Sequence, residues 1–237
     1  MNRALKFLVT LVLLPTVLLL AWGVCALTVR IALNLSFTMP FVAGAFIYAF
    51  MHYFFFRPAR VYVLAHELTH AAAAVISGVK VGKISVGRSG GSVTLSGSST
   101  FISLAPYCLP LFAAVLAVVY RLSGFFMDIM PYRPWFTAGI GFFLLFHILH
   151  TAESLLGHTQ SDLKKAGGVL FSVTLIMLAN SLVLFLSFKL LFPGIIPARQ
   201  YFSGVWSNTA YFWQSVFLLT RKAVVKAGPF LETLSPF

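Results

Sequence analysis

The chain has 237 residues, of which 59% are hydrophobic and only 9% are charged, whereas an ordinary soluble domain has roughly 25% charged residues. This composition excludes a water-soluble globular protein, because too few polar side chains are present to cover one. The formal net charge is +12, and the Lys and Arg residues mostly lie at the ends of apolar segments. Their expected counter-charge is therefore anionic lipid headgroups and not nucleic acid.

The predicted elements are membrane helices, because about 20 apolar residues are needed to cross a bilayer. We expect an integral, multi-pass, all-α membrane protein with about six transmembrane helices. The fourth predicted span contains Pro106 and Pro110, so it is expected to be kinked or to enter and leave on the same side. The predicted spans cover residues 7–29, 39–56, 61–77, 102–120, 135–156 and 168–192.

Between the third and fourth predicted spans, residues 80–99 lack a helical pattern and are rich in Gly and Ser. Ile84 and Val86 alternate with small or polar residues, turn residues follow, and Val93 and Leu95 resume the alternation. This pattern predicts a small β-hairpin. Because a hairpin beside a membrane must have its edges covered, a free edge is a candidate docking site for another strand.

Proline and glycine residues end the sixth predicted span, and an aromatic segment follows over 205–226. The aromatic residues of this segment and the cations near its end predict either an interfacial helix or a seventh span. We expect residues 1–237 to form a single membrane domain, with a core over 57–192 and a C-terminal segment over 193–237.

The most informative motif is the sequence HELTH at residues 66–70. On a helix, His66 and His70 project from the same face and can both ligate one Zn²⁺, which lowers the pKa of water. Glu67 is then a carboxylate that can take the proton. The composition of the chain predicts on the order of 0.002 such motifs by chance. The alternative interpretation is that both histidines only form hydrogen bonds between helices. This interpretation is weaker, because three titratable groups would then be desolvated without compensation.

Zinc in hydrolases usually has three protein ligands, so a third is expected. His147, His150 and Glu153 form one stripe on a predicted helix, which could line a polar cavity or form a contact between helices. Asp162 precedes the sixth predicted span, where a helix-capping role is the alternative. The candidate third ligands are Asp162, Glu153, His150, His147, His158 and Asp128.

Together these motifs resemble the site-2 protease superfamily of intramembrane zinc metalloproteases, most closely its compact bacterial branch. The similarity covers about residues 58–190 and rests on AHELTHA at 65–71, the Gly-rich hairpin, SLAPYCLP at 103–110 and QSDL at 160–163. Two features differ from the family pattern. Asp162 is followed by Leu-Lys-Lys where the family has Gly, and an Ala-Pro-Tyr sequence stands where the family has Asn-Pro-x-Gly.

The resemblance implies that His66, His70 and Asp162 are zinc ligands and that Glu67 is the general base. It also implies an activity: hydrolysis of a peptide bond in a membrane-associated protein, in the bacterial inner (plasma) membrane. From the residues alone, a different class of function stays open. The chain could be a non-proteolytic metal-binding subunit with membrane-protein partners, or an ion- or proton-translocating component that uses the His/Glu/Asp cluster.

The resemblance further implies that a substrate helix unwinds before cleavage, because its scissile carbonyl is otherwise hydrogen-bonded within the helix. His147 or His150 is then expected to polarise that carbonyl or to stabilise the oxyanion. An edge strand of the hairpin, at 84–86 or 93–95, is expected to hold the unwound segment by β-augmentation. The residues expected to form the substrate strand are Ile84, Ser85 and Val86.

Overall fold

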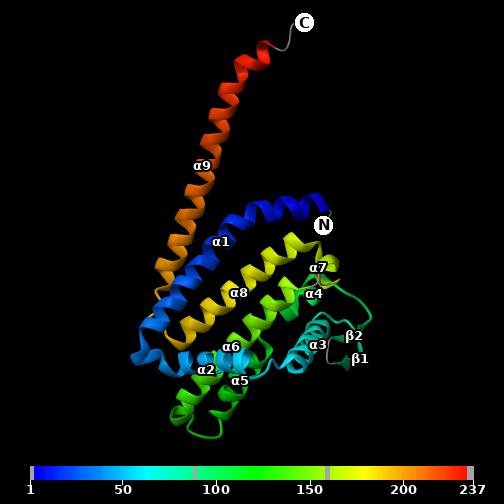
Figure 1. Ribbon diagram of the computed structural model, residues 1–237, viewed down its shortest axis with the longest axis vertical. Helices are drawn as coiled ribbons and strands as arrows, with labels where there is room; N and C mark the ends of the chain where they lie inside the picture. Colours follow the sequence, from blue (N-terminus) through cyan, green and yellow to red (C-terminus); the bar gives the residue numbers. More distant parts are fainter. Residues whose placement is uncertain (1–2, 88–89, 158–160, 234–237) are drawn as a thin grey trace.

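The structure, a computed structural model, describes residues 3–87, 90–157 and 161–233. It is mainly helical with one small β-hairpin, so the predicted all-α class with a hairpin is confirmed (Figure 1). His158, one of the candidate ligands, lies outside the described residues. In chain order the elements are α1 (Arg3–Leu33), α2 (Leu35–Phe54), α3 (Ala59–Ile76), β1 (Val81–Val86), β2 (Gly91–Leu95), α4 (Thr100–Cys108), α5 (Leu111–Ser123), a 3₁₀ turn (Met130–Tyr132), α6 (Arg133–Leu156), α7 (Ser161–Ala166), α8 (Val169–Leu191) and α9 (Ala198–Thr233).

Among the described residues, four helices are long and apolar enough to cross a membrane: α1, α2, α6 with the turn before it, and α8. A fifth span results if α4 and α5 count as one, although they are bent by 76° at their junction. These helices support the prediction of a membrane protein, but the expected six spans are not confirmed. The third predicted span, 61–77, corresponds to α3, whose hydropathy is lowered by Arg60, His66, Glu67 and His70.

The long helices form a bundle in which α1 packs beside α8, and α2 packs against α6 (Figure 1). The bundle core consists of aliphatic and aromatic side chains. Phe41 of α2, for example, meets the rings of Phe188 and Phe192 edge-to-face, with centroid separations of 5.7 and 5.8 Å. Such offset contacts are the preferred geometry of aromatic pairs.

Glycines allow α2 and α6 to approach each other closely. A Cβ atom on Gly44 would overlap the backbone of Ala138, and one on Gly141 would overlap the backbone of Phe41. Small residues at a crossing let two membrane helices pack backbone against backbone. The contact continues to Tyr48, which is fully buried against α6.

A tight turn connects α3 directly to the hairpin. Gly78 has a φ of 69°, in the left-handed region that favours glycine at the end of a helix. The amide of Val79 donates to the carbonyl of Ala74 at 2.8 Å, which closes the turn. β1 and β2 pair antiparallel with Ile84 opposite Val93, and both strands contact α3.

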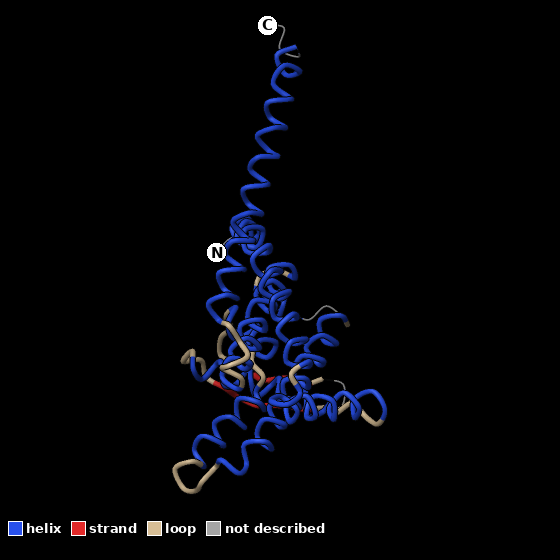
Figure 2. The backbone as a smooth tube through the Cα atoms, turned by 90° about the vertical axis from the view of Figure 1, so that its left-hand side faces the viewer, coloured by secondary structure: helices blue, strands red, loops and turns tan. Residues whose placement is uncertain are grey.

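The C-terminal helix α9 projects away from the bundle, as Figure 1 and Figure 2 both show. The aromatic segment expected over 205–226 is part of this one helix, which is not among the candidate membrane spans. Its first turns are anchored by Tyr201. The hydroxyl of Tyr201 donates to the carbonyl of Leu20 at 2.8 Å, and its ring stacks on Phe185 with a centroid separation of 4.5 Å.

Candidate metal centre

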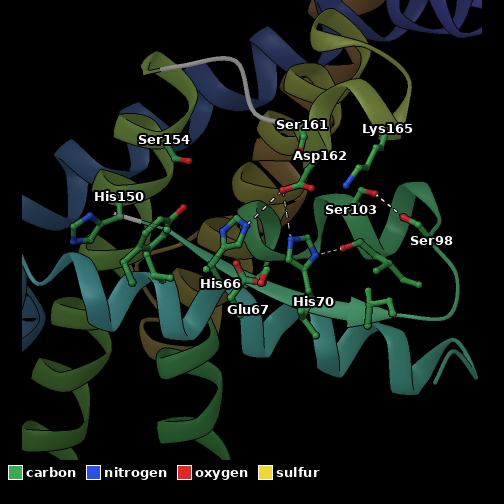
Figure 3. A pocket seen from close by; sticks show the side chains of 18 of the residues that line it. His66, Glu67, His70, Ser98, Ser103, His150, Ser154, Ser161, Asp162 and Lys165 are labelled. Carbon is green, nitrogen blue, oxygen red and sulfur yellow. Dashed lines mark hydrogen bonds and ion pairs between the residues drawn. The ribbon is translucent and has the colours of Figure 1, made fainter. Parts of the chain in front are cut away.

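The side chains of His66, His70 and Asp162 converge on one point (Figure 3). The Nε2 atoms of His70 and His66 lie 3.5 and 3.7 Å from the same Asp162 oxygen, Oδ2, and the ligand atoms of all three residues lie within 4.8 Å of one another. Two ligands that bind one zinc ion at about 2.0–2.1 Å in a tetrahedron are about 3.3 Å apart. This donor set therefore fits a zinc ion in both chemistry and spacing.

His66 and His70 point to the same side because they lie one turn apart on α3. Their ring centroids are 4.8 Å apart. The ring of His66 also meets the rings of Tyr62 and Tyr107, at 5.8 and 5.0 Å. This packing restrains the orientation of the His66 imidazole.

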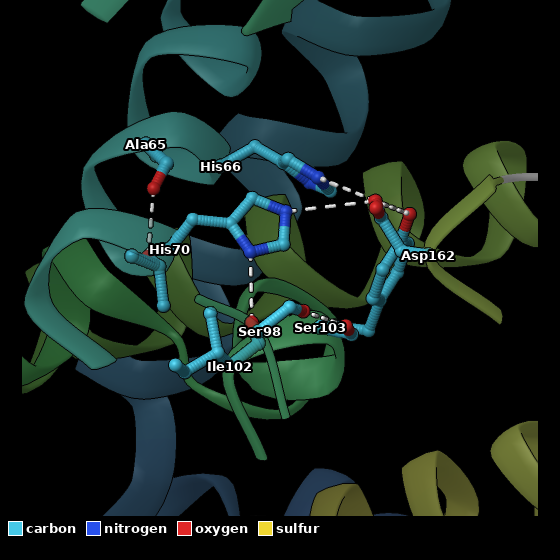
Figure 4. A network of polar contacts seen from close by, with 9 residues as sticks. Ala65, His66, His70, Ser98, Ile102, Ser103 and Asp162 are labelled. Carbon is cyan, nitrogen blue, oxygen red and sulfur yellow. Dashed lines mark hydrogen bonds and ion pairs between the residues drawn. The ribbon is translucent and has the colours of Figure 1, made fainter. Parts of the chain in front are cut away.

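His70 is oriented by a hydrogen bond from its other ring nitrogen. Nδ1–H donates to the carbonyl of Ile102 at 2.8 Å, which orients the ring so that Nε2 faces Asp162 (Figure 4). The carbonyl of Ile102 can lie this close because α4 packs on the small side chains of Ala73 and Ala74.

Asp162 lies in the short helix α7, which is anchored by the buried side chain of Leu163. The hydroxyl of Tyr107 donates to Asp162 Oδ2 at 3.3 Å. Burial alone would raise the pKa of the Asp162 carboxyl, but the neighbouring imidazoles of His66 and His70 hold that pKa well below its usual range. Asp162 is therefore an ionised acceptor at neutral pH.

Tyr107 is in turn held by polar side chains of α6 and α8. Asn180 Nδ2 donates to the carbonyl of Tyr107 at 2.7 Å, and Asn180 Oδ1 lies 3.1 Å from His147 Nε2. His147, which was expected to face a polar cavity, thus contacts the support of the site and does not line the cavity described below. Asn180 was not among the expected residues. Its signal in the sequence is an amide within a mostly apolar predicted span.

A cavity of about 830 Å³ adjoins the three converging side chains (Figure 3). Its walls come from α3, β2, α4, the end of α6 and α7. Glu67 lies on the wall beside both histidines, with its side chain mostly buried. His150 and Glu153 also line the cavity, which is one of the two alternatives that the sequence left open for the stripe on α6.

The strand β2 passes directly over Glu67. A Cβ atom on Gly91 would lie only 2.7 Å from Glu67 Cγ and 2.9 Å from Oε1, so this close approach requires a glycine. Ser92 and Val93 of β2 also line the cavity. The strand that borders the cavity is therefore β2. The residues expected to form the substrate strand lie instead in the outer strand β1 and are exposed: Ile84, Ser85 and Val86.

The other candidate third ligands lie elsewhere. His150 and Glu153 form a separate group with His52. Asp128 is exposed in the loop after α5, where its carboxylate accepts from the amide of Met130 at 3.0 Å. Among the described candidates, Asp162 is the one that the structure brings to the two histidines.

Comparisons of the chain with protein-family models, with curated proteins and with solved structures give no match. The functional interpretation below therefore depends on the geometry of the site and on the motifs that form it.

Proposed function

We propose that the protein is a zinc-dependent intramembrane endopeptidase that hydrolyses a peptide bond of a membrane protein. The observation that carries the proposal is the convergence of His66, His70 and Asp162 beside Glu67 at the wall of a cavity. The resemblance of the HELTH segment and its surroundings to the compact bacterial site-2 proteases supports the same activity and a location in a bacterial inner membrane.

In the proposed reaction, the side chains of the site have separate roles. His66, His70 and Asp162 would hold the zinc ion, which when bound would act as a Lewis acid toward water and the scissile carbonyl. Glu67 takes a proton from the attacking water and gives it to the leaving amine. The hydrogen bonds of His70 with Ile102 and of Asp162 with Tyr107 orient two of the ligands and so support the site.

The substrate in this proposal is a membrane-spanning segment that unwinds at the cavity. Among the described residues, the sheet has two strands, so β2 has no strand on its second edge. Because Gly91, Ser92 and Val93 of β2 border the cavity, this strand is better located than β1 to hold an extended peptide by main-chain hydrogen bonds. His150 lies on the same cavity wall, but its Nδ1 faces Glu153 at 3.2 Å, so the expected role in polarising the scissile carbonyl is not assigned to it.

The substitution Glu67→Gln tests the proposal, because it removes the proton acceptor and keeps the shape of the side chain. Cleavage is expected to fall by about 10²- to 10⁴-fold, the usual contribution of general acid–base catalysis. Zinc content is expected to be unchanged. The measurement compares membrane-protein fragments between cells that express the wild-type chain and cells that express the variant.

Fragments that appear with the wild type and disappear with Glu67→Gln identify substrates. The proposal would be overturned if the same fragments persisted in cells that express Glu67→Gln. It would also be overturned if the membrane proteins of the two kinds of cell did not differ. Zinc analysis of the two purified proteins serves as the control for the integrity of the site.

A further inference from the structure

A second group of side chains that could ligate a metal ion lies where the end of α2 meets the end of α6. His52 Nε2 is 3.1 Å from Oε1 of Glu153, and His150 Nδ1 is 3.2 Å from Oε2 of the same carboxylate. The ligand atoms of the three residues all lie within 4.8 Å of one another. The nitrogen–oxygen distances are close to the spacing of about 3.3 Å between two ligands of one tetrahedral zinc ion.

The two histidines are fixed in place before any ion binds. Both are buried, with 3% exposure for His52 and 4% for His150. His52 Nδ1 lies 3.2 Å from the hydroxyl of the fully buried Tyr48, and this contact fixes the ring. In the tautomer that carries its proton on Nδ1, the lone pair of Nε2 faces Glu153 and is available to a metal ion. The ring of His150 stacks on Tyr62 with a centroid separation of 4.9 Å.

We propose that His52, His150 and Glu153 form a second metal site, which binds a borderline divalent cation such as Zn²⁺ and joins α2 to α6 at the wall of the cavity. Two imidazoles and a carboxylate form a donor set that suits zinc. The proposal goes beyond the peptidase function and does not depend on it.

The second site is separate from the first. The ring of Tyr62 meets His66 at 5.8 Å and His150 at 4.9 Å, so it lies between the two groups. Co-catalytic metal pairs lie only about 3.5–4 Å apart and share ligands. The geometry therefore points to an ion that braces the cavity wall, not to a partner in the reaction.

Arg57 competes with the cation at this site. Its Nη1 lies 3.2 Å from Oε1 of Glu153, and its side chain is 61% exposed. A cation bound to Glu153 repels the guanidinium, and an exposed arginine between α2 and α3 can move into solvent. Removing this charge should therefore strengthen metal binding.

The test measures the zinc content of the full-length protein, purified in detergent and equilibrated with Zn²⁺. The wild type is expected to bind two equivalents. The double variant His66→Ala/His70→Ala is expected to keep one equivalent, and His52→Ala/His150→Ala is expected to lose one. Thr137→Ala, which changes a buried polar residue of α6 outside both groups, is the control and is expected to keep two equivalents.

A folded His66→Ala/His70→Ala protein without zinc would overturn the second site, as would two equivalents in His52→Ala/His150→Ala. If the latter protein does not fold, Glu153→Gln replaces it, with an expected loss of about 100-fold or more in affinity at the second site. An unchanged affinity would count against the proposal. Because the readout is metal content, failure here is distinguishable from failure of the Glu67→Gln cleavage test.

The exposed arginine provides an independent variant that leaves the core intact. In the His66→Ala/His70→Ala background, Arg57→Gln is expected to raise the affinity for Zn²⁺ about two- to fivefold, the range of an exposed ion pair. Arg60→Gln, which removes a cation from the start of α3, is the control and is expected to have no effect. Equal or weaker zinc binding in Arg57→Gln would contradict the assignment of Glu153 as a ligand.

Discussion

Gly91 is the residue of the hairpin that lies against the proposed general base. The space that a side chain would fill at this position is occupied by the Cγ and Oε1 atoms of Glu67 and by Cγ1 of Val63. Any larger residue must push β2 away from α3 or rotate the Glu67 carboxylate. The identity of this residue therefore affects the position of the Glu67 carboxylate without contributing a functional group.

We expect Gly91→Ala to reduce cleavage of a substrate by about 10- to 100-fold, because misplacement of a catalytic group by about 1 Å has effects of this size. Zinc content is expected to stay at the wild-type level, since none of the three converging ligands is touched. Gly90→Ala is the matched control, because a Cβ atom there would meet nothing within 4 Å. Equal activity of the two variants would contradict the close packing of β2 on Glu67.

At the residue scale, the sequence predicted those parts of the site that follow from local spacing. His66, Glu67 and His70 lie within one helical turn, so their common location needs no tertiary information. The support of the site depends on contacts between distant elements, such as those of Tyr107 with Asp162 and Asn180. His52 is a single histidine among aromatic residues, and only the packing of α2 on α6 brings it to Glu153.

At the scale of helices, the close crossing of α2 and α6 brings together His52, His150 and Glu153, the proposed second metal site. Gly44 and Gly141 remove the side chains that would otherwise separate the two backbones. Further along the same pair of helices, His52 then meets His150 and Glu153. Packing at the crossing and metal binding at the helix ends should therefore be linked.

We expect Gly141→Ala to lower the free energy of unfolding by about 1–3 kcal/mol, the usual cost of overpacking a tight contact. The new methyl group would overlap backbone atoms of Phe41, which cannot move without shifting α2. Gly139→Ala is the control on the same helix, because its methyl group would meet only the side-chain end of Leu116. Unfolding curves in mixed micelles measure the difference. Equal stability of the two variants would contradict the close approach of the α2 and α6 backbones.

The predictions of the hairpin and of the helix break, which depend on local sequence patterns, were confirmed, whereas the predicted number of spans was not. The alternation around Ile84 and Val93 was sufficient to predict the hairpin, and the prolines of 102–120 correctly indicated a break. The predicted count of six spans is not confirmed: four helices qualify, and a fifth only if α4 and α5, which are bent by 76°, count as one span. The predicted span 61–77 corresponds to α3, which carries the polar groups of the site.

At the scale of the whole molecule, the two groups of proposed ligands come from segments that are distant in the chain. The first group ties α3 to α7, and the second ties α2 to α6. An ion that binds only the folded chain stabilises it according to its concentration and affinity. Metal removal should therefore destabilise the entire bundle and not only the cavity.

We expect chelation of metal to lower the unfolding temperature of the purified protein. At a free zinc concentration 100 times the dissociation constant, each site contributes about 2.7 kcal/mol. The variant that combines His52→Ala, His66→Ala, His70→Ala and His150→Ala is the control, in which the chelator should have no effect. Thermal unfolding with and without chelator measures the shift, and an identical shift in this variant would show that it does not come from these sites.

The bend between α4 and α5 has a consequence for the surrounding lipid. With a rise of about 1.5 Å per residue, the 31 residues of α1 extend about 46 Å, whereas the 9 residues of α4 extend only about 14 Å. Residues 102–107 of α4 are buried within the protein, so lipid meets mainly α5, whose 13 residues extend about 20 Å and expose Val115, Val118 and Leu122. This length is less than the roughly 30 Å of a bilayer core, so we expect the acyl-chain region to be thinner beside α5 than beside α1.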